Sequence, residues 1–407
     1  MIDFSREVRE RFLLQQEYLG TTKAVNHTKP LVSVSVATYQ HVHFIEQCLD
    51  DILAQETDFP YEIIVGEDGS VDGTRDICIK YAINHPDKIR LFLRDRNTTT
   101  LMHENRQIRF NGVFCRMSCR GKYIALCEGD DYWTDPHKLQ KQVEFLEAHP
   151  ECSMCFHEAY DLWPDGSKKL FVRARASEIK PLYTLDDVVI RYFIPTASMV
   201  FRKTAVEDLP REFYQAPGGD WFLHVILSQS GYLGYIDEPW SVYRWHTGGV
   251  MSYAPQTAQL RHTMDTAFFI NQYLDDNYSH LLRPFIVKHL IELVVLEAAG
   301  AITNNKNLSV RETIQQKVES CSHHLALSLK EVDIIASAVT QRLVYVFYGM
   351  DDLATVRNCW LASLRWPAYL PWRNRGFWSI GLTALLGQKH SNQIRAAIRM
   401  LESNHSR

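Results

Sequence analysis

The sequence predicts an α/β fold in which a mostly parallel sheet is flanked by helices and followed by an α-helical region. Up to about residue 252, short apolar runs rich in β-branched residues alternate with amphipathic stretches of helical period. Beyond that point only helical periodicity continues. We therefore expect a helical extension over residues 1–29, an α/β domain over 30–252 and a helical domain over 253–407.

Turn residues bound each predicted element, and we distinguish strands from helices by the length of the apolar run. Strands are expected at residues 31–37, 61–65, 89–93, 122–127, 152–162, 196–201, 232–236 and 240–245. Helices are expected at residues 44–53, 74–82, 114–119, 138–148 and 222–227. The polar residues 97–105 are expected to form a loop. Alternating strands and helices imply right-handed crossovers, which bring the carboxyl ends of the strands to one edge.

The strand at 122–127 delivers acidic side chains at its carboxyl end, in the turn 128–131. Adjacent carboxylates that would repel in a dry crevice make sense if they share a divalent cation. Mg²⁺ and Mn²⁺ prefer oxygen ligands and commonly combine one or two carboxylates with substrate phosphates. Asp130 and Asp131 therefore suit a metal diphosphate, with a solvated acidic turn before a helix as the alternative interpretation.

Polar residues also follow the first two strands. Thr38 and Tyr39 end the first strand, and Glu67 and Asp68 end the second. Ligands of open α/β sheets bind beyond the carboxyl ends of the strands, so these residues should share a crevice with the acidic turn. An aromatic ring and a hydroxyl can hold a base, and a carboxylate can accept hydrogen bonds from a base or a ribose.

Composition narrows the class of protein. The chain has 407 residues, 46% hydrophobic and 23% charged, which is ordinary for a globular protein. A net charge of −4 offers no basic field for nucleic acid. The nine cysteines lack paired spacing, and the lone C-x-x-C at Cys152 and Cys155 falls in a strand, so core packing is favoured over metal binding. Without a signal-peptide core or a run of about 18 apolar residues, the expected location is cytoplasmic.

Three segments together resemble the family 2 inverting glycosyltransferases, which have a glycosyltransferase-A fold. They are VSVATYQHVHFIEQCLDDILAQ, IIVGEDGSVDGT and GKYIALCEGDDYWTDP, and the resemblance covers about residues 31–250. It implies a nucleotide-sugar donor, most often UDP-linked, and Mn²⁺ or Mg²⁺. The family's aspartate-x-aspartate element falls on Glu128, Gly129 and Asp130. The resemblance implies Asp131 as a metal ligand and Asp130 as a ligand of ribose or metal.

The same resemblance extends to later residues. Asp220, in the turn Pro217–Trp221, stands where the family carries its catalytic base, and as a residue opening a helix it is otherwise an N-cap. Arg244 and His246 resemble the family's late arginine and histidine segment. Arg244 is expected to pair with the diphosphate, and a neutral His246 to complete the metal shell or contact phosphate.

The helical region carries no catalytic motif or repeat. From Pro371 onward, basic residues flank a short apolar stretch that is either a buried helix or a peripheral contact with the inner face of a membrane. Such a contact would fit a lipid-linked acceptor. The sequence thus predicts a metal-dependent glycosyltransferase that moves a sugar from a nucleotide-sugar to a hydroxyl of a surface glycan. The alternatives are a catalytically degenerate nucleotide-sugar-binding subunit and a nucleotidyltransferase; the motifs of dehydrogenases and P-loop NTPases are absent.

Overall fold

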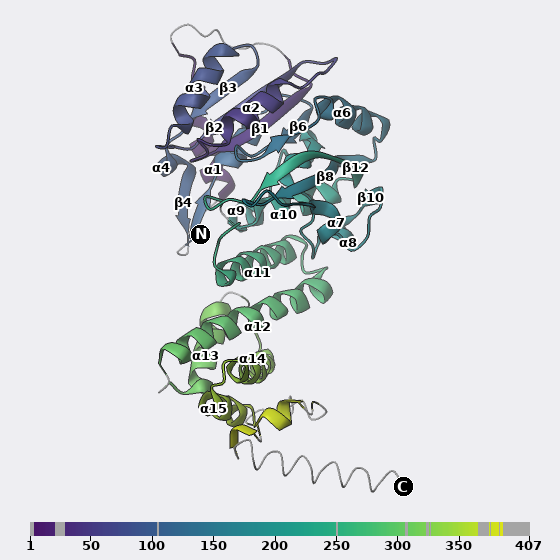
Figure 1. The fold of residues 1–407 in the computed structure, drawn as a ribbon. Helices are drawn as coiled ribbons and strands as arrows, with labels where there is room; N and C mark the ends of the chain where they lie inside the picture. The colour runs from purple at the N-terminus through teal and green to yellow at the C-terminus, as the bar shows by residue number, and fades with distance from the viewer. Residues whose placement is uncertain are drawn as a thin grey trace. The chain divides into compact units, whose positions relative to one another are not determined.

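The computed structural model of the chain describes residues 4–20, 29–103, 106–249, 251–305, 308–322, 325, 327–364, 374, 376–381 and 383–385. These residues form two units (Figure 1). The first contains residues up to 254 and 269–282, and the second contains 255–268 and residues from 283 onward. The α/β class and the helical carboxyl-terminal region are confirmed.

The first unit is built on a ten-stranded sheet with the order β10-β12-β8-β11-β6-β1-β2-β3, to which β7 and β9 add at β12 and β8. Its strands are β1 (Val32–Thr38), β2 (Tyr61–Glu67), β3 (Ile89–Leu93), β6 (Tyr123–Leu126), β7 (Tyr132–Trp133), β8 (Cys152–Leu162), β9 (Lys168–Leu170), β10 (Leu182–Tyr183), β11 (Val200–Arg202) and β12 (Tyr232–Arg244). Strands β6, β1, β2 and β3 run parallel, whereas β11 runs antiparallel to both β6 and β8. Strands β8 and β12 also pair parallel, so the sheet is mixed: two parallel groups of strands are joined through the antiparallel β11.

Helices cover this sheet. They are α1 (Phe4–Leu13), α2 (Ile45–Leu53), α3 (Thr74–Asn84), α5 (Asn111–Ser118), α6 (Lys138–Ala148), α7 (Phe171–Arg175), α8 (Leu185–Val188), α9 (Arg211–Gln215) and α10 (Gly219–Gln229). The apolar stripe of α2 packs into a core with β1, β2 and β6. Cys152 and Cys155 are buried in β8, as core packing predicts.

Three predictions of local structure were wrong. Of the strand expected at 196–201, Thr196–Ser198 form a 3₁₀ helix and the strand β11 begins only at Val200. The expected loop at 97–105 contains α4 (Arg96–Thr99) and the strand β4 (Thr100–His103), which pairs with β5 (Arg106–Arg109). Among the strands that the structure describes, β4 and β5 pair only with each other, so they need no apolar face that a sequence pattern would reveal. The strands expected at 232–236 and 240–245 are one strand, β12, whose register against β8 shifts between Ile236 and Ser241.

The second unit is helical. Its described helices include parts of α11 (Gln256–Tyr273) and α12 (Ser279–Asn304), and all of α13 (Val310–Ser322), α14 (Leu329–Gly349) and α15 (Leu353–Ser363). Across the described residues, every helix is too short or too polar to cross a membrane. The stretch from residue 371, with its suggested membrane contact, lies for the most part outside the described residues.

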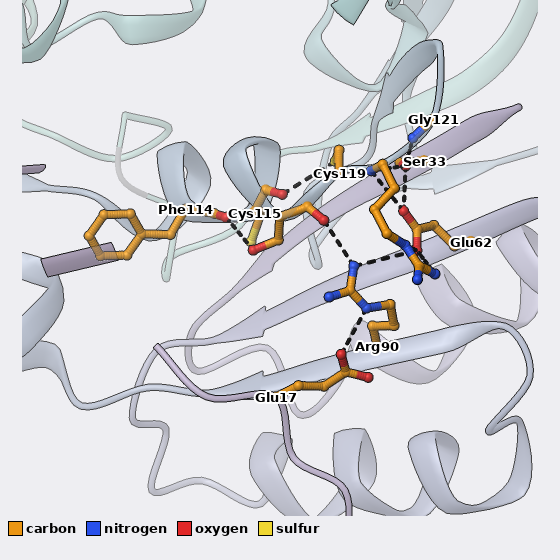
Figure 2. A network of polar contacts seen from close by, with 10 residues as sticks. Glu17, Ser33, Glu62, Arg90, Phe114, Cys115, Cys119 and Gly121 are labelled. Carbon is orange, nitrogen blue, oxygen red and sulfur yellow. Dashed lines mark hydrogen bonds and ion pairs between the residues drawn. The ribbon is translucent and has the colours of Figure 1, made fainter. Parts of the chain in front are cut away.

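A buried carboxylate joins the amino ends of the strands (Figure 2). Glu62 accepts hydrogen bonds from the Ser33 hydroxyl at 2.7 Å and from the backbone and guanidinium of Arg120 at 2.6–2.9 Å. Arg90 lies 3.5 Å away and also pairs with Glu17, which belongs to the segment before the sheet. Gly121 completes the junction, because a Cβ there would lie 2.7 Å from the Ser33 nitrogen.

The helix α10 contains a histidine that the core isolates from water. His224 is fully buried, and among the described residues neither of its ring nitrogens has a hydrogen-bond partner. Its ring stacks on Tyr192, with centroids 5.6 Å apart and planes 15° apart. Burial lowers the pKa of His224 to about 4, against a small opposing effect of Asp220. The imidazole is therefore neutral in the folded protein at neutral pH.

Replacing Glu62 should weaken the whole first unit. We expect Glu62→Gln to lower the free energy of unfolding by about 3 kcal/mol, because it leaves buried donors without their charged acceptor. Urea denaturation measures this. The matched control is Glu46→Gln, whose carboxylate is 54% exposed and pairs with Lys80, and we expect a change below about 0.5 kcal/mol. Equal losses in the two variants would contradict the assigned role of Glu62.

Replacing His224 should change how stability depends on pH. The unfolded chain binds a proton at His224 near pH 6.5, and the folded chain only near pH 4. Stability is therefore lost as pH falls through this window, by about 2 kcal/mol between pH 8 and pH 5. In urea titrations, the free energy of unfolding of His224→Phe should not show this loss of about 2 kcal/mol between pH 8 and pH 5. His137→Phe, a change at an exposed histidine, should show the same loss as wild type. The same pH slope in wild type and His224→Phe would refute the account.

Candidate functional site

The acidic turn 128–131 follows β6 and lies against the end of β1. The Gly129 backbone donates to the Ala37 carbonyl at 3.0 Å. A Cβ at Gly129 would lie 2.5 Å from the Thr38 hydroxyl oxygen and 3.0 Å from Nδ1 of His41. Only glycine permits this approach. Because the Thr38 carbonyl also accepts from the Asp68 nitrogen at 3.1 Å, Thr38 joins the ends of three neighbouring strands.

Asp130 is flanked by two imidazoles. One of its carboxylate oxygens lies 3.1 Å from Nε2 of His246 and 3.5 Å from Nε2 of His41. The Nδ1 atom of His41 lies 3.2 Å from the Thr38 hydroxyl. Burial pushes the pKa of Asp130 upward, but the hydrogen bond with His246 and the charge of His41 outweigh it and hold the pKa below its usual value. Burial lowers the pKa of His41. Asp130 is thus the carboxylate of this turn that stays ionised.

Asp131 points into the protein. It is 1% exposed, and its Oδ1 accepts a hydrogen bond from the Arg244 backbone at 3.0 Å. Burial and the charge of Asp130 raise its pKa well above the usual value. The Arg244 guanidinium donates to the Asp130 carbonyl at 2.6 Å and lies 4.2 Å from the Tyr132 ring centroid. These contacts tie the acidic turn to the end of β12.

The ends of β1 and β2 form a second polar group. Tyr39 is 36% exposed, and the guanidinium of Arg96 lies 3.5 Å from its ring centroid. Asp68 is 3% exposed, accepts from the Thr99 hydroxyl, and has a raised pKa because it is buried. Arg96 lies 3.8 Å from Asp68. This group therefore places a guanidinium stacked on an aromatic ring, Arg96 on Tyr39, next to the carboxyl group of Asp68.

Glu67 has partners of its own in the turn after β2. It is fully buried, accepts from the Ser70 backbone at 2.6 Å and pairs with Arg75 of α3. Its two oxygens therefore hold the turn after β2 and the start of α3.

Asp220 lies in the first turn of α10. Its Oδ2 accepts a hydrogen bond from the Tyr192 hydroxyl at 2.8 Å, and its Oδ1 accepts from the Trp221 backbone at 3.0 Å. Burial and the charges of Asp130 and, more weakly, Asp220 raise the pKa of Glu128 to about 8. Glu128 is thus within electrostatic range of both Asp130 and Asp220.

The structure brings several predicted residues into one region: Thr38, Asp130, Asp131, Arg244 and His246 through direct contacts, Tyr39 and Asp68 beside them, and Asp220 through its charge. Sequence reasoning missed His41, Arg96 and Tyr192. A signal existed for His41, which stands three residues after Thr38 in the loop beyond the first strand. Arg96 and Tyr192 lie in segments where the sequence carries no comparable signal.

The site has a partial set of metal ligands. Asp130 and His246 supply a carboxylate and an imidazole, a pair that divalent cations such as Mn²⁺ accept. In the part of the chain that the structure describes, no group of three or more His, Cys, Asp and Glu side chains is gathered as a metal cage. These residues fit a cation that completes its shell with substrate phosphates and water.

Comparisons with known proteins agree with this fold. The model of glycosyl transferase family 2 matches residues 33–208. An uncharacterised protein of Mycobacterium tuberculosis is 37% identical over 225 residues, which are 54% of this chain and 60% of that protein. The chain thus spans less than two thirds of this relative.

More distant similarities also exist. An uncharacterised glycosyltransferase of a Nostoc species is 26% identical over 256 residues, covering 60% of this chain and 74% of that protein. The solved structure of residues 1–349 of S. aureus TarS with UDP-GlcNAc is 17% identical, with a TM-score of 0.45, over 76% of this chain and 91% of that one. The resemblance seen in the sequence motifs is confirmed for the part of the chain that carries it: residues 33–208 match the model of glycosyl transferase family 2.

Proposed function

We propose that the chain is an inverting glycosyltransferase that moves a sugar from a nucleotide-sugar to a hydroxyl of a glycan acceptor. The observation that carries the proposal is the grouping around Glu128. Asp130, held ionised by two histidines, and Asp220, at a helix start, act on this one side chain from separate loops. Asp130 would hold the donor diphosphate through a bound cation, and Asp220 would take the proton of the attacking hydroxyl.

The donor would bind between the ends of β1, β2 and β6. Tyr39 and Arg96 offer a stacking surface for the base, and Asp68 is an acceptor for its N–H groups or for a ribose hydroxyl. Thr38 lies between this surface and the acidic turn. We propose a UDP-sugar as the donor, as the family resemblance implies.

The diphosphate would lie beside Asp130, His246 and Arg244. Asp130 and His246 would hold Mn²⁺ or Mg²⁺, which when bound neutralises charge on the leaving diphosphate. In this proposal Asp131 serves by fixing Arg244, because its carboxylate is buried and already accepts the Arg244 backbone N–H. Glu67 likewise shapes the turn beside Asp68 through Ser70 and Arg75.

Asp220 would act as the general base. As the acceptor oxygen forms its bond to the anomeric carbon, the bond from that carbon to the diphosphate oxygen breaks on the opposite face, and the hydroxyl proton passes to the Asp220 carboxylate. The hydrogen bonds from Tyr192 and the Trp221 backbone orient this carboxylate. The diphosphate leaves with the bonding electron pair, and configuration at the anomeric carbon inverts because the hydroxyl attacks from the opposite face.

Asp220→Asn should abolish transfer and spare nucleotide binding. We expect nucleotide release from the best of a panel of UDP-, GDP- and dTDP-sugars to fall at least about a hundredfold, because no group remains to take the proton. The UDP-induced rise in melting temperature with Mn²⁺ should remain close to that of wild type. Coupled nucleotide-release and thermal-shift assays measure the two quantities.

Asp208→Asn is the matched control, since this carboxylate is 90% exposed and should leave both quantities unchanged. Equal loss of binding and release in Asp220→Asn would contradict its role as base. Binding of UDP-sugars by wild type without release of any nucleotide would favour the alternative of a binding subunit. Release of pyrophosphate from nucleoside triphosphates would favour a nucleotidyltransferase.

A further inference from the structure

A strip of aromatic side chains leads away from Asp220. We define the aromatic strip as Tyr192, Tyr243, Trp245 and Trp163, together with Phe171 beneath them. Trp163 and Trp245 lie nearly parallel, with centroids 5.9 Å apart and planes 11° apart, and Trp245 meets Tyr243 edge-on at 5.8 Å. Phe171 contacts Tyr243 at 5.9 Å and Tyr192 at 6.2 Å. The rings therefore form one chain of contacts, which runs from the residue after β8 through the end of β12 and α7 to the segment before β11.

The strip is partly open to solvent. Phe171 is 2% exposed and forms its floor, whereas the other four side chains are half-buried. Half-buried aromatic rings in a row are unusual on a protein without a partner for them, because their apolar faces gain from leaving water. The Tyr192 hydroxyl and the Trp245 indole N–H already donate to Asp220 and Asp161, whereas the Trp163 indole N–H and the Tyr243 hydroxyl can donate to a ligand at the edge of the ring.

A buried ion pair orients the strip. The Trp245 indole nitrogen donates to Oδ1 of Asp161 at 2.7 Å, and the same carboxylate pairs with Arg175 at 2.7 and 3.2 Å. Asp161 is 1% exposed. Placing a carboxylate there has a desolvation cost that good geometry must offset. The hydrogen bond from Trp245 to Asp161 fixes the orientation of the indole ring, as pre-organised binding requires.

The strip ends at the proposed base and borders the proposed donor site. Its inner member, Tyr192, donates to Asp220 at 2.8 Å. Its middle member, Tyr243, has a pKa raised by burial and by the charges of Asp131, Asp130 and Asp220. Tyr243 and Trp245 alternate along the chain with Arg244 and His246, which contact Asp130. A molecule lying on the aromatic strip would therefore have one end close to Asp220 and Asp130.

We propose that the aromatic strip is an acceptor subsite that binds the pyranose rings of a glycan. A pyranose has an apolar face of C–H groups and a rim of hydroxyls, which suits flat rings with polar edges. A nucleobase has its own stacking surface on Tyr39 and Arg96, and a lipid chain would not use the polar edges. Lys169, an exposed side chain 5.5 Å from the Trp163 centroid, would rotate aside or bond a sugar hydroxyl. This inference rests on the proposed function.

The test uses the full chain and saccharides of known structure. With the best donor, nucleotide release is measured against increasing concentrations of methyl hexosides, methyl N-acetylhexosaminides and the corresponding disaccharides. We expect wild type to be stimulated, and by a disaccharide at lower concentration than by the monosaccharide. In Trp163→Ala the KM for the disaccharide should rise about tenfold, because a central stacking surface is lost. Trp163→Phe, which keeps a ring, should recover most of this loss.

The matched control is Tyr232→Ala, a 45% exposed aromatic at the other end of β12, whose saccharide KM should equal that of wild type. Circular dichroism of each variant checks folding. A wild-type KM in Trp163→Ala, or no stimulation of wild type by any saccharide while Asp220→Asn is inactive, would overturn the subsite and leave the proposed function standing. Failure of wild type to release nucleotide from any donor would overturn the proposed function and this inference with it.

Discussion

The hydrogen bond from the Arg244 backbone to the buried Asp131 carboxylate is the interaction on which the site depends. It joins the turn after β6 to the end of β12, two segments separated by 113 positions in sequence. The Arg244 guanidinium adds a second link to the Asp130 carbonyl, and His246 then reaches the Asp130 carboxylate. The Asp131 side chain is 1% exposed, so removing it would leave the Arg244 backbone N–H without its acceptor.

The hydrogen bond between Arg244 and Asp131 joins two halves of one sheet, and in the proposed function each half binds a different substrate. The half containing β1, β2, β3 and β6 ends in Thr38, Tyr39, Asp68 and the acidic turn, where a nucleotide and its diphosphate would lie. The half containing β8 and β12 ends in the aromatic strip, beside α10 with Asp220. Inversion requires the leaving diphosphate and the attacking hydroxyl to lie on opposite sides of the anomeric carbon. The fold thus suits a donor on one side and an acceptor on the other.

Much of the fold could be predicted from the sequence, because buried parallel strands such as residues 32–38 are short and rich in β-branched residues, and their ends meet at one edge. The ribbon at 100–109 could not, since it has no core-facing pattern. For the candidate site, the sequence indicated the acidic and polar residues at strand ends. It did not reveal which carboxylates turn inward, as Asp131 and Glu67 do, because burial depends on partners distant in sequence. The contact between Tyr192 and Asp220 depends on loop geometry in the same way.

The most direct test of the account is calorimetric titration of UDP with and without Mn²⁺, in wild type and in Asp130→Asn. If Asp130 and His246 share a cation with the diphosphate, Mn²⁺ should tighten UDP binding to wild type by at least about tenfold, and Asp130→Asn should lose that gain while retaining its melting behaviour. UDP affinity that is indifferent to Mn²⁺ in wild type, or an undiminished Mn²⁺ effect in Asp130→Asn, would contradict the central claim.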